Sequence, residues 1–393
     1  MKNKLILLTT VALVFTLFGL KHTSAQETPI PQDEGVLPED FIPTETPENY
    51  NPQQESMKGT IVGVFEEGVK EVYGQQHEFQ TLKVKITKGS LKNQEVDVLH
   101  GILPEAGAPK YKNGDKVYLI KALAPTGEEV LYITDYSRTE NLLVLFVLFA
   151  GLVIIVSRWW GVSSLVGLFY AAVIIFKFLL PRIANGDNPI LMAILAASFI
   201  APVTFYLSHG LNKKTSIALV GTLISLLITG FLAAVFVKLT NLTGFGSEEA
   251  LFLQVATGGS INIKGLLMAG IIIGSLGILD DVTITQASIV FQLKKTDKKL
   301  NATKLFQRAI DLGHDHIAST VNTLVLVYTG AAMPLLLLFI NNPITTTELI
   351  NSEIISEEIV RTLVSSIGLI LAIPITTLLA SLTLTGKGAS TKV

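Results

Sequence analysis

Long apolar runs fill the second part of the chain, from Asn141 onward. Seven of them are long enough, or nearly so, to cross about 30 Å of hydrocarbon as helices. These candidate spans are residues 141–157, 162–180, 190–208, 215–237, 264–280, 317–340 and 360–384. The fifth is short if it ends at Asp280, unless its helix continues toward Leu293. The pattern predicts an α-helical polytopic membrane bundle of about seven spans over residues 141–385.

Residues 57–138 have a different pattern. They contain five short β-type runs, and in two of these runs apolar and polar side chains alternate. Alternation is typical of half-buried strands, and turn signals at residues 88–90 and 113–115 separate the runs. Five short strands in about 80 residues predict a small β-barrel-like, OB-like domain. Such a fold names no ligand by itself, so we interpret it as a sensing, docking or structural domain.

The N-terminal segment differs from both regions. A basic start and an apolar stretch over residues 5–20 precede the small residues Thr23 and Ala25. This pattern predicts a secretory signal peptide over residues 1–25, the alternative being an uncleaved membrane anchor. Residues 26–56 are rich in Pro, Glu, Asn and Gln, which predicts a disordered linker.

The distribution of positive charge predicts the orientation. If residues 26–140 are exported, the loops after the first, third and fifth spans and the tail at 386–393 lie inside the cell. Eleven Lys and Arg residues fall in those inner segments, against about four in the opposite loops. Cytoplasmic loops carry the excess of Lys and Arg, so the signal peptide and the charge bias agree. We expect a plasma-membrane protein with an extracytoplasmic β domain and a cytoplasmic C-terminus.

Composition narrows the class further. The chain is 49% hydrophobic and 16% charged, with mean hydropathy +0.52, which does not fit a soluble enzyme. A net charge of −2 gives no case for nucleic acid as a partner. The absence of cysteine excludes thiolate metal sites and cysteine nucleophiles. Membrane lipid is the expected partner, with a membrane-protein partner or a homo-oligomer left open.

Two adjacent carboxylates interrupt the fifth span. The polar residues of this segment are Asp280, Asp281, Thr285 and Gln286. One helical face carries Gly270, Gly274, Gly277 and Asp281, and glycines permit close contact with another helix. Adjacent carboxylates repel each other, which suits a proton carrier or a cation site. The alternative is that both lie in the headgroup region, where a charge costs little.

Polar side chains also gather at the start of the sixth span. They are His314, Asp315, His316, Ser319, Asn322 and Thr323. Imidazole and carboxylate groups are ligands for Zn²⁺ or Mn²⁺, so a divalent cation stays open although no cofactor is evident. By topology these groups lie at the same membrane face as Asp280 and Asp281, as do His209 and Asn212. We therefore predict a shared cation or proton site, the alternative being that each histidine lies at headgroup level.

Two further segments are candidates for lining a path. The fourth span carries on one face Thr222, Ser225 and Thr229. Such a stripe lines a path or, more often, packs against other helices. Residues 247–256 predict a short helix with Ser247 as N-cap and Glu248 and Glu249 in the first turn, which is either re-entrant and cavity-lining or a surface helix. Arg361 either snorkels to the outer interface or pairs with a glutamate just before it.

Several runs carry a family resemblance. They are residues 277–288, 314–324, 358–364 and 374–377, together with the segments around His209 and Thr243. These runs resemble the YibE/F-like family of bacterial multi-pass membrane proteins, over about residues 57–385. The resemblance implies a membrane topology and points to the same polar residues, but it implies no substrate.

The leading functional hypothesis is a transporter or permease with a cytoplasm-facing acidic and histidine site for a cation or proton. One alternative is a non-transporting scaffold or sensor that assists a partner complex. Another is a metal-dependent membrane enzyme, which is least favoured because no nucleophile or complete ligand set is visible.

Overall fold

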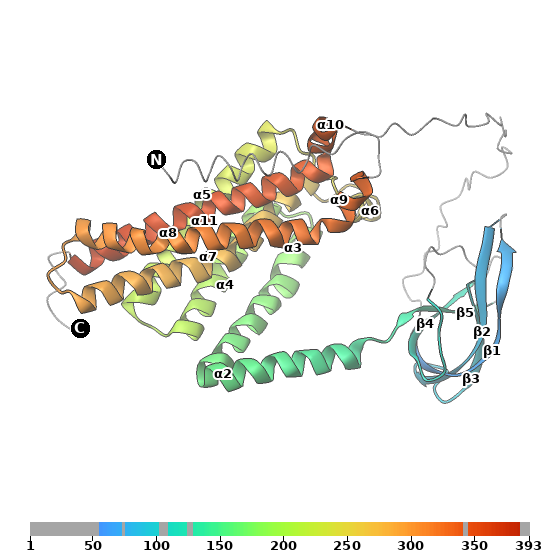
Figure 1. Cartoon of the computed structure of the whole chain (residues 1–393). Coiled ribbons are helices and arrows are strands. Elements are labelled where there is room, and N and C mark those ends of the chain that lie inside the picture. The colour runs from blue at the N-terminus through green and yellow to red at the C-terminus, as the bar shows by residue number, and fades with distance from the viewer. Residues whose placement is uncertain (1–54, 73–74, 102–108, 124–128, 341–344, 386–393) are drawn as a thin grey trace. The chain divides into compact units, whose positions relative to one another are not determined.

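The computed structural model describes residues 55–72, 75–101, 109–123, 129–340 and 345–385 of the 393-residue chain. The predicted signal peptide, nearly all of the predicted linker and the tail at 386–393 lie outside these residues. The chain divides into two compact units, one ending at Arg138 and the other beginning at Thr139. The first is a β unit and the second is helical (Figure 1).

Five antiparallel strands form the β unit, in the order β3-β2-β1-β4-β5. They are β1 (Ser56–Val72), β2 (Gln75–Lys88), β3 (Glu95–His100), β4 (Lys116–Leu123) and β5 (Glu129–Tyr136). The edge strands β3 and β5 also approach each other, so the sheet curls. The predicted β domain is confirmed, whereas its OB-like character stays a prediction.

Alternate side chains of the strands build the core of the β unit. Leu82, Val84 and Ile86 of β2 are fully buried, as their alternation predicted. The buried amide of Gln80 holds the chain at Tyr111, because its Nε2 donates to the Tyr111 carbonyl at 3.1 Å and its Oε1 accepts from the Tyr111 N–H at 2.8 Å. Both backbone groups of a buried residue are therefore satisfied by one side chain.

The helical unit contains eleven described elements. They are α2 (Thr139–Ile174), the π-helix η2 (Ile175–Leu179), α3 (Leu180–Ala184), α4 (Pro189–His209), α5 (Lys213–Leu239), α6 (Glu248–Ala256), α7 (Ile263–Thr296), α8 (Ala302–Ala331), α9 (Met333–Ile340), α10 (Thr346–Asn351) and α11 (Glu353–Thr385). Five helical stretches are long and apolar enough to cross a membrane, namely Thr139–Ala184, α4, α5, α7 and α11. The predicted membrane bundle is confirmed, but the count of seven spans is not.

The difference in count has local causes. Arg158 has φ 53° and ψ −129°, so the first two predicted spans fall on either side of a kink within one continuous stretch. The predicted sixth span is divided at Ala332 between α8 and α9, and α8 begins with a polar half. The predicted continuation of the fifth span toward Leu293 is confirmed, because α7 runs past the aspartates to Thr296.

Close packing joins α5, α7 and α11, while α4 packs on α7 and α8 packs on α11. Small residues allow this approach: a Cβ added at Gly368 of α11 would overlap Thr229 of α5, and one added at Gly221 of α5 would overlap Thr376 of α11. The three-helix core thus depends on glycine at its contacts, as is typical of membrane helices.

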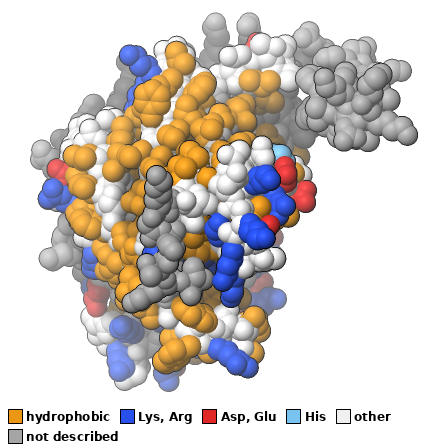
Figure 2. All heavy atoms as spheres, turned by 90° about the vertical axis from the view of Figure 1, so that its left-hand side faces the viewer, with side chains coloured by type: hydrophobic (Ala, Val, Ile, Leu, Met, Phe, Trp, Pro, Cys, Tyr) orange, Lys and Arg blue, Asp and Glu red, His pale blue; other side chains and the backbone are white. Residues whose placement is uncertain are grey.

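Apolar side chains cover much of the outer surface of the helical unit. Leu145, Ile155 and Phe169 of α2 are among many large hydrophobic residues that are exposed. Figure 2 shows wide hydrophobic areas with Lys and Arg side chains gathered in groups beside them. This is the surface expected of a chain whose helices face lipid.

Candidate functional site

The two aspartates of α7 lie near the middle of a long helix. Within α7, no Asp, Glu, Lys or Arg other than this pair occurs between Lys264 and Lys294. At 1.5 Å per residue, Asp280 lies about 24 Å along the axis from Lys264, and Asp281 lies about 20 Å from Lys294. The pair is therefore far from both basic ends of the helix, which favours the intramembrane interpretation over the headgroup one.

Few contacts with other residues are recorded for this pair of aspartates. Asp280 is partly buried, and its Oδ1 is buried with no hydrogen-bond partner among the described residues. Asp281 is exposed, and it lies within electrostatic range of Asp280 and of His209 at the end of α4. A meeting of the α4 end with the aspartates stays a prediction, because no bond between them is recorded in the described residues. Asn212 instead caps α5, where its Oδ1 accepts from the Thr215 N–H at 2.9 Å.

The polar stripe of α8 is placed differently. Its exposed members are His314, Asp315, Ser319, Asn322 and Thr323. His316 is partly buried, and its Nε2 finds no partner within the described part of the chain. In the residues that the structure describes, no group of three or more His, Asp or Glu side chains is arranged to hold a metal ion. The structure records no bond from this stripe to the α7 aspartates, so a shared site stays a prediction.

Gln286 connects three helices. It is fully buried, and its Nε2 donates to the Ala309 carbonyl of α8 at 2.9 Å and to Thr377 Oγ1 of α11 at 2.8 Å. Its neighbour Thr285 is only partly buried. The structure thus gives Gln286 a role in holding α7, α8 and α11 together.

The predicted path residues of α5 lie inside the packed core. Thr222, Ser225 and Thr229 are all fully buried. Thr222 shares a 2.6 Å hydrogen bond with Thr283 of α7, and the Thr229 hydroxyl donates to the Ser225 carbonyl at 2.8 Å. These contacts favour the packing interpretation of the stripe over an open path.

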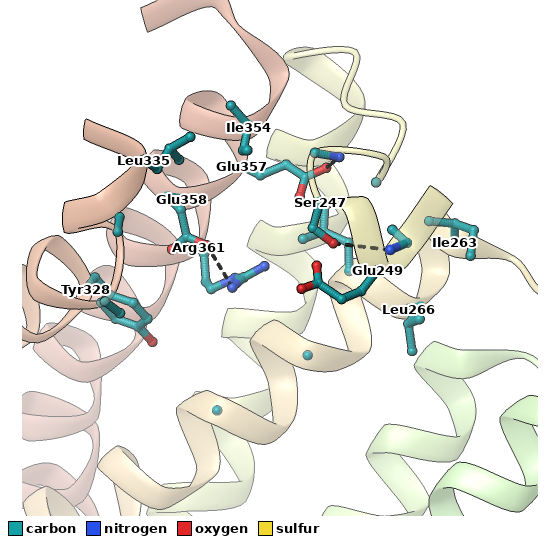
Figure 3. Close-up of a pocket in the computed structure, with 18 residues that line it drawn as sticks. Ser247, Glu249, Ile263, Leu266, Tyr328, Leu335, Ile354, Glu357, Glu358 and Arg361 are labelled. Carbon is teal, nitrogen blue, oxygen red and sulfur yellow. Dashed lines mark hydrogen bonds and ion pairs between the residues drawn. The ribbon is translucent and has the colours of Figure 1, made fainter. Parts of the chain in front are cut away.

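A cavity of about 760 Å³ lies toward the other end of α7. It is bounded by α6, α7, α8, α9 and α11 and by the loop before α6 (Figure 3). Its polar lining consists of Ser247, Glu249, Tyr328, Glu357, Glu358 and Arg361. The remaining wall is mostly apolar and includes Leu266 and Leu335. This volume is in the range of small-molecule sites.

Charged groups meet in this cavity. The Nη1 of Arg361 pairs with Glu358 Oε1 at 2.8 Å, which confirms the predicted glutamate partner. The Nε of Arg361 is buried and has no hydrogen-bond partner among the residues described. Glu249 of α6 and Arg361 of α11 point toward one another (Figure 3). Glu249, which was predicted to line a path, therefore lines this cavity. Glu248, predicted for the same role, is not among the residues that line it. The predicted cap is confirmed, since Ser247 Oγ accepts from the Ala250 N–H at 3.2 Å.

Two carboxylates of α11 hold the loop that precedes α6. Glu353 Oε1 accepts from the N–H of Thr243 at 2.6 Å and from the N–H of Gly244 at 3.0 Å. Glu357 is almost fully buried and accepts from the N–H of Gly246 at 3.0 Å. A Cβ added at Gly246 would lie 2.7 Å from Glu357 Cδ, so glycine is needed for this approach. Sequence reasoning missed this clasp, although the Thr243 segment was part of the family resemblance.

One face of α7 runs between the cavity and the aspartates. Gly270 and Gly274 line the cavity, and Gly277 and Asp281 continue the same face. A Cβ added at any of the three glycines would meet nothing within 4 Å. The close helix contact predicted for these glycines is therefore wrong for this structure, because no described helix packs on that face. We call Gly270, Gly274, Gly277 and Asp281 the open face of α7.

The fold and these sites define a class: a polytopic α-helical membrane protein with an N-terminal β unit. A family model described as YibE/F-like protein matches residues 145–386, and the chain belongs to the YibE/F-like family. The match begins inside α2, so the β unit lies outside it. No curated protein and no solved structure gives a match.

Proposed function

We propose that this protein is a permease that moves a proton or a small cation through the membrane, with Asp280 and Asp281 as its ion-binding groups. The observation that supports this most directly is the open face of α7, which leads from the cavity to carboxylates near the middle of a 34-residue helix. Ionisable groups at membrane depth are costly and mark ion paths and proton relays.

The environment of Asp280 supports the same proposal. A buried carboxylate oxygen without a partner is destabilising by about 1–3 kcal/mol or more, and a bound proton or cation would remove that cost. The imidazole of His209 lies within electrostatic range of Asp281, so it offers a second titratable group beside the pair. His314, Asp315 and His316 of α8 are proposed to join the site only when α8 moves relative to α7.

The orientation of this permease follows from the charge bias. We propose that the stretch Thr139–Ala184 crosses the membrane twice, once on each side of the kink at Arg158. The Lys294 end of α7 then faces the cytoplasm and the cavity opens toward the extracytoplasmic side, where the β unit captures a ligand or docks a partner. The cavity would then be the entrance and the open face of α7 the route to the aspartates.

Ion flux in proteoliposomes tests this proposal. The full-length protein, Asp280→Asn and Asp281→Asn would be compared in vesicles that report proton, Na⁺ and K⁺ movement separately. Asp297→Asn is the matched control, because Asp297 is an exposed residue just after α7 that lies 3.7 Å from Arg308. We expect both α7 variants to lose most of the flux and the control to keep it. Equal flux in all four proteins would remove the aspartates from the mechanism.

The open face of α7 also favours a second function. Small residues at i and i+4 allow another helix to approach closely, so a scaffold could receive a partner helix there. In that case the thiols introduced by Gly274→Cys in two copies that meet at this face should form a disulfide with each other when an oxidant such as copper phenanthroline is added, since the chain has no other cysteine. The aspartate variants would then leave function intact.

A further inference from the structure

We infer that the cavity between α6 and α11 binds a zwitterionic amphiphile, meaning a headgroup with an ammonium and a phosphate joined to a hydrocarbon tail. The inference goes beyond the proposed function, since it assigns a lipid-binding site to the cavity and leaves the transported ion unchanged. Binding is measured separately from flux, so the two proposals fail independently.

The cavity carries more negative than positive charge, which favours a bound cation. Three carboxylates, Glu249, Glu357 and Glu358, line it against one guanidinium, Arg361. Glu357 is 6% exposed, and its recorded hydrogen bond is the one from the Gly246 N–H. A buried carboxylate is destabilised unless hydrogen bonds or a positive group compensate its charge, and the one guanidinium nearby is already paired with Glu358. A ligand ammonium placed between Glu249 and Glu357 would do so.

The guanidinium has donors left for an oxyanion. Arg361 uses Nη1 for Glu358, while its buried Nε has no partner in the part of the chain that is described. Figure 3 shows the guanidinium reaching into the cavity toward Glu249. Guanidinium groups bind phosphate with two parallel hydrogen bonds. A phosphate beside Arg361 and an ammonium beside Glu249 would therefore satisfy both sides of the cavity at once.

A hydrocarbon tail would fit a separate, mostly apolar pocket beside the cavity. A second pocket of about 270 Å³ shares Tyr328, Ala332 and Glu358 with the cavity and extends between α8 and α11. The rest of its lining is Val325, Thr329, Leu336, Ile355, Ile359, Thr362 and Leu363. Burial of apolar surface there stabilises a bound chain by roughly 25 cal/mol per Å². A free zwitterion such as an amino acid would leave this pocket empty, so an amphiphile fits better.

Binding of short-chain lipids to the full-length protein in detergent tests the inference. The probe is dihexanoyl phosphatidylethanolamine, compared with dihexanoyl phosphatidylglycerol, which lacks the ammonium, and with phosphoethanolamine, which lacks the tails. We expect the first to bind at least about tenfold more tightly than either of the others, as one charge-assisted hydrogen bond implies. Equal binding of phosphatidylglycerol would overturn the role of the ammonium. Equal binding of phosphoethanolamine would overturn the role of the tail.

Variants locate the binding to this cavity. Arg361→Gln and Glu249→Gln should each weaken phosphatidylethanolamine binding by at least about tenfold. Arg182→Gln is the matched control, because Arg182 pairs with Asp187 at 2.7 Å and does not line the cavity. Ala332→Phe, which keeps every charge, should remove the preference for a tail and so covers the case in which Arg361→Gln fails to fold. Unchanged affinity in Glu249→Gln and Ala332→Phe would refute the site.

Discussion

The contact between Gly368 and Thr229 allows the packing of the α5–α7–α11 core to be tested by one methyl group. In Gly368→Ala the new Cβ would overlap Thr229 Oγ1 and lie 3.2 Å from Thr229 Cβ and 3.4 Å from Cγ2. Thr229 is fully buried, and its hydroxyl donates to the Ser225 carbonyl at 2.8 Å. Its side chain is β-branched and stiff in a helix, so the helices must move apart to accept the methyl group.

The expected magnitude follows from two opposing effects. Overpacking a well-packed core costs about 1–3 kcal/mol. Replacing glycine by alanine inside a helix returns about 0.5–1 kcal/mol. The net loss in the free energy of unfolding is therefore about 0–2.5 kcal/mol, and its central value of about 1 kcal/mol lowers the midpoint of thermal unfolding by about 2–4 °C for a unit of this size.

Thermal unfolding of the detergent-solubilised protein measures this loss. Gly277→Ala is the matched control, because the same methyl group on the open face of α7 meets nothing within 4 Å. We expect Gly277→Ala to keep or raise the midpoint and Thr229→Ala to recover part of the loss when it is combined with Gly368→Ala. Equal midpoints for Gly368→Ala and Gly277→Ala would refute the packing argument.

Two further predictions concern hydrogen bonds between a side chain and the backbone. Gln80→Leu leaves the N–H and carbonyl of Tyr111 without their side-chain partner, which should destabilise the β unit by about 2–4 kcal/mol. Amide exchange in β2 and β4 should therefore rise. The control is Gln94→Leu, whose wild-type side chain is exposed, and it should leave amide exchange unchanged. Glu353→Gln weakens charge-assisted bonds to the loop at 243–246, so amide exchange in that loop should rise, and unchanged exchange would contradict the role of the clasp.

Much of the fold could be predicted, because the order of apolar and polar residues along the chain determines where its helices and strands form. Apolar runs located the membrane helices, and alternation located buried positions such as Leu82 and Val84 in β2. The break between the first two predicted spans, residues 158–161, coincides with the kink at Arg158. The end of α7 was left open between Asp280 and a continuation toward Leu293, because carboxylates are typical of a helix end whereas the mixed apolar and polar segment after them suits a helix. The structure shows the continuation, as far as Thr296.

For the candidate site, the sequence predicted which residues share a face of one helix, but not how the helices meet. Periodicity correctly placed Gly270, Gly274 and Asp281 on one face of α7. Topology suggested that His209 lies near the aspartates, but topology does not specify how a helix such as α8 is rotated about its axis. The cavity depends on contacts between residues more than one hundred positions apart, such as Gly246 with Glu357. Such contacts follow from helix packing, which no local pattern encodes.

Thiol labelling of the open face tests the central claim most directly. The chain has no cysteine, so Gly274→Cys and Gly277→Cys each introduce a single thiol on that face. If this face is a hydrated route to Asp281, both thiols react rapidly with a charged, membrane-impermeant reagent, and Leu363→Cys on the exposed apolar surface of α11 reacts slowly. Labelling of Gly277→Cys as slow as that of Leu363→Cys would show that lipid or a partner helix covers the face and would contradict the permease.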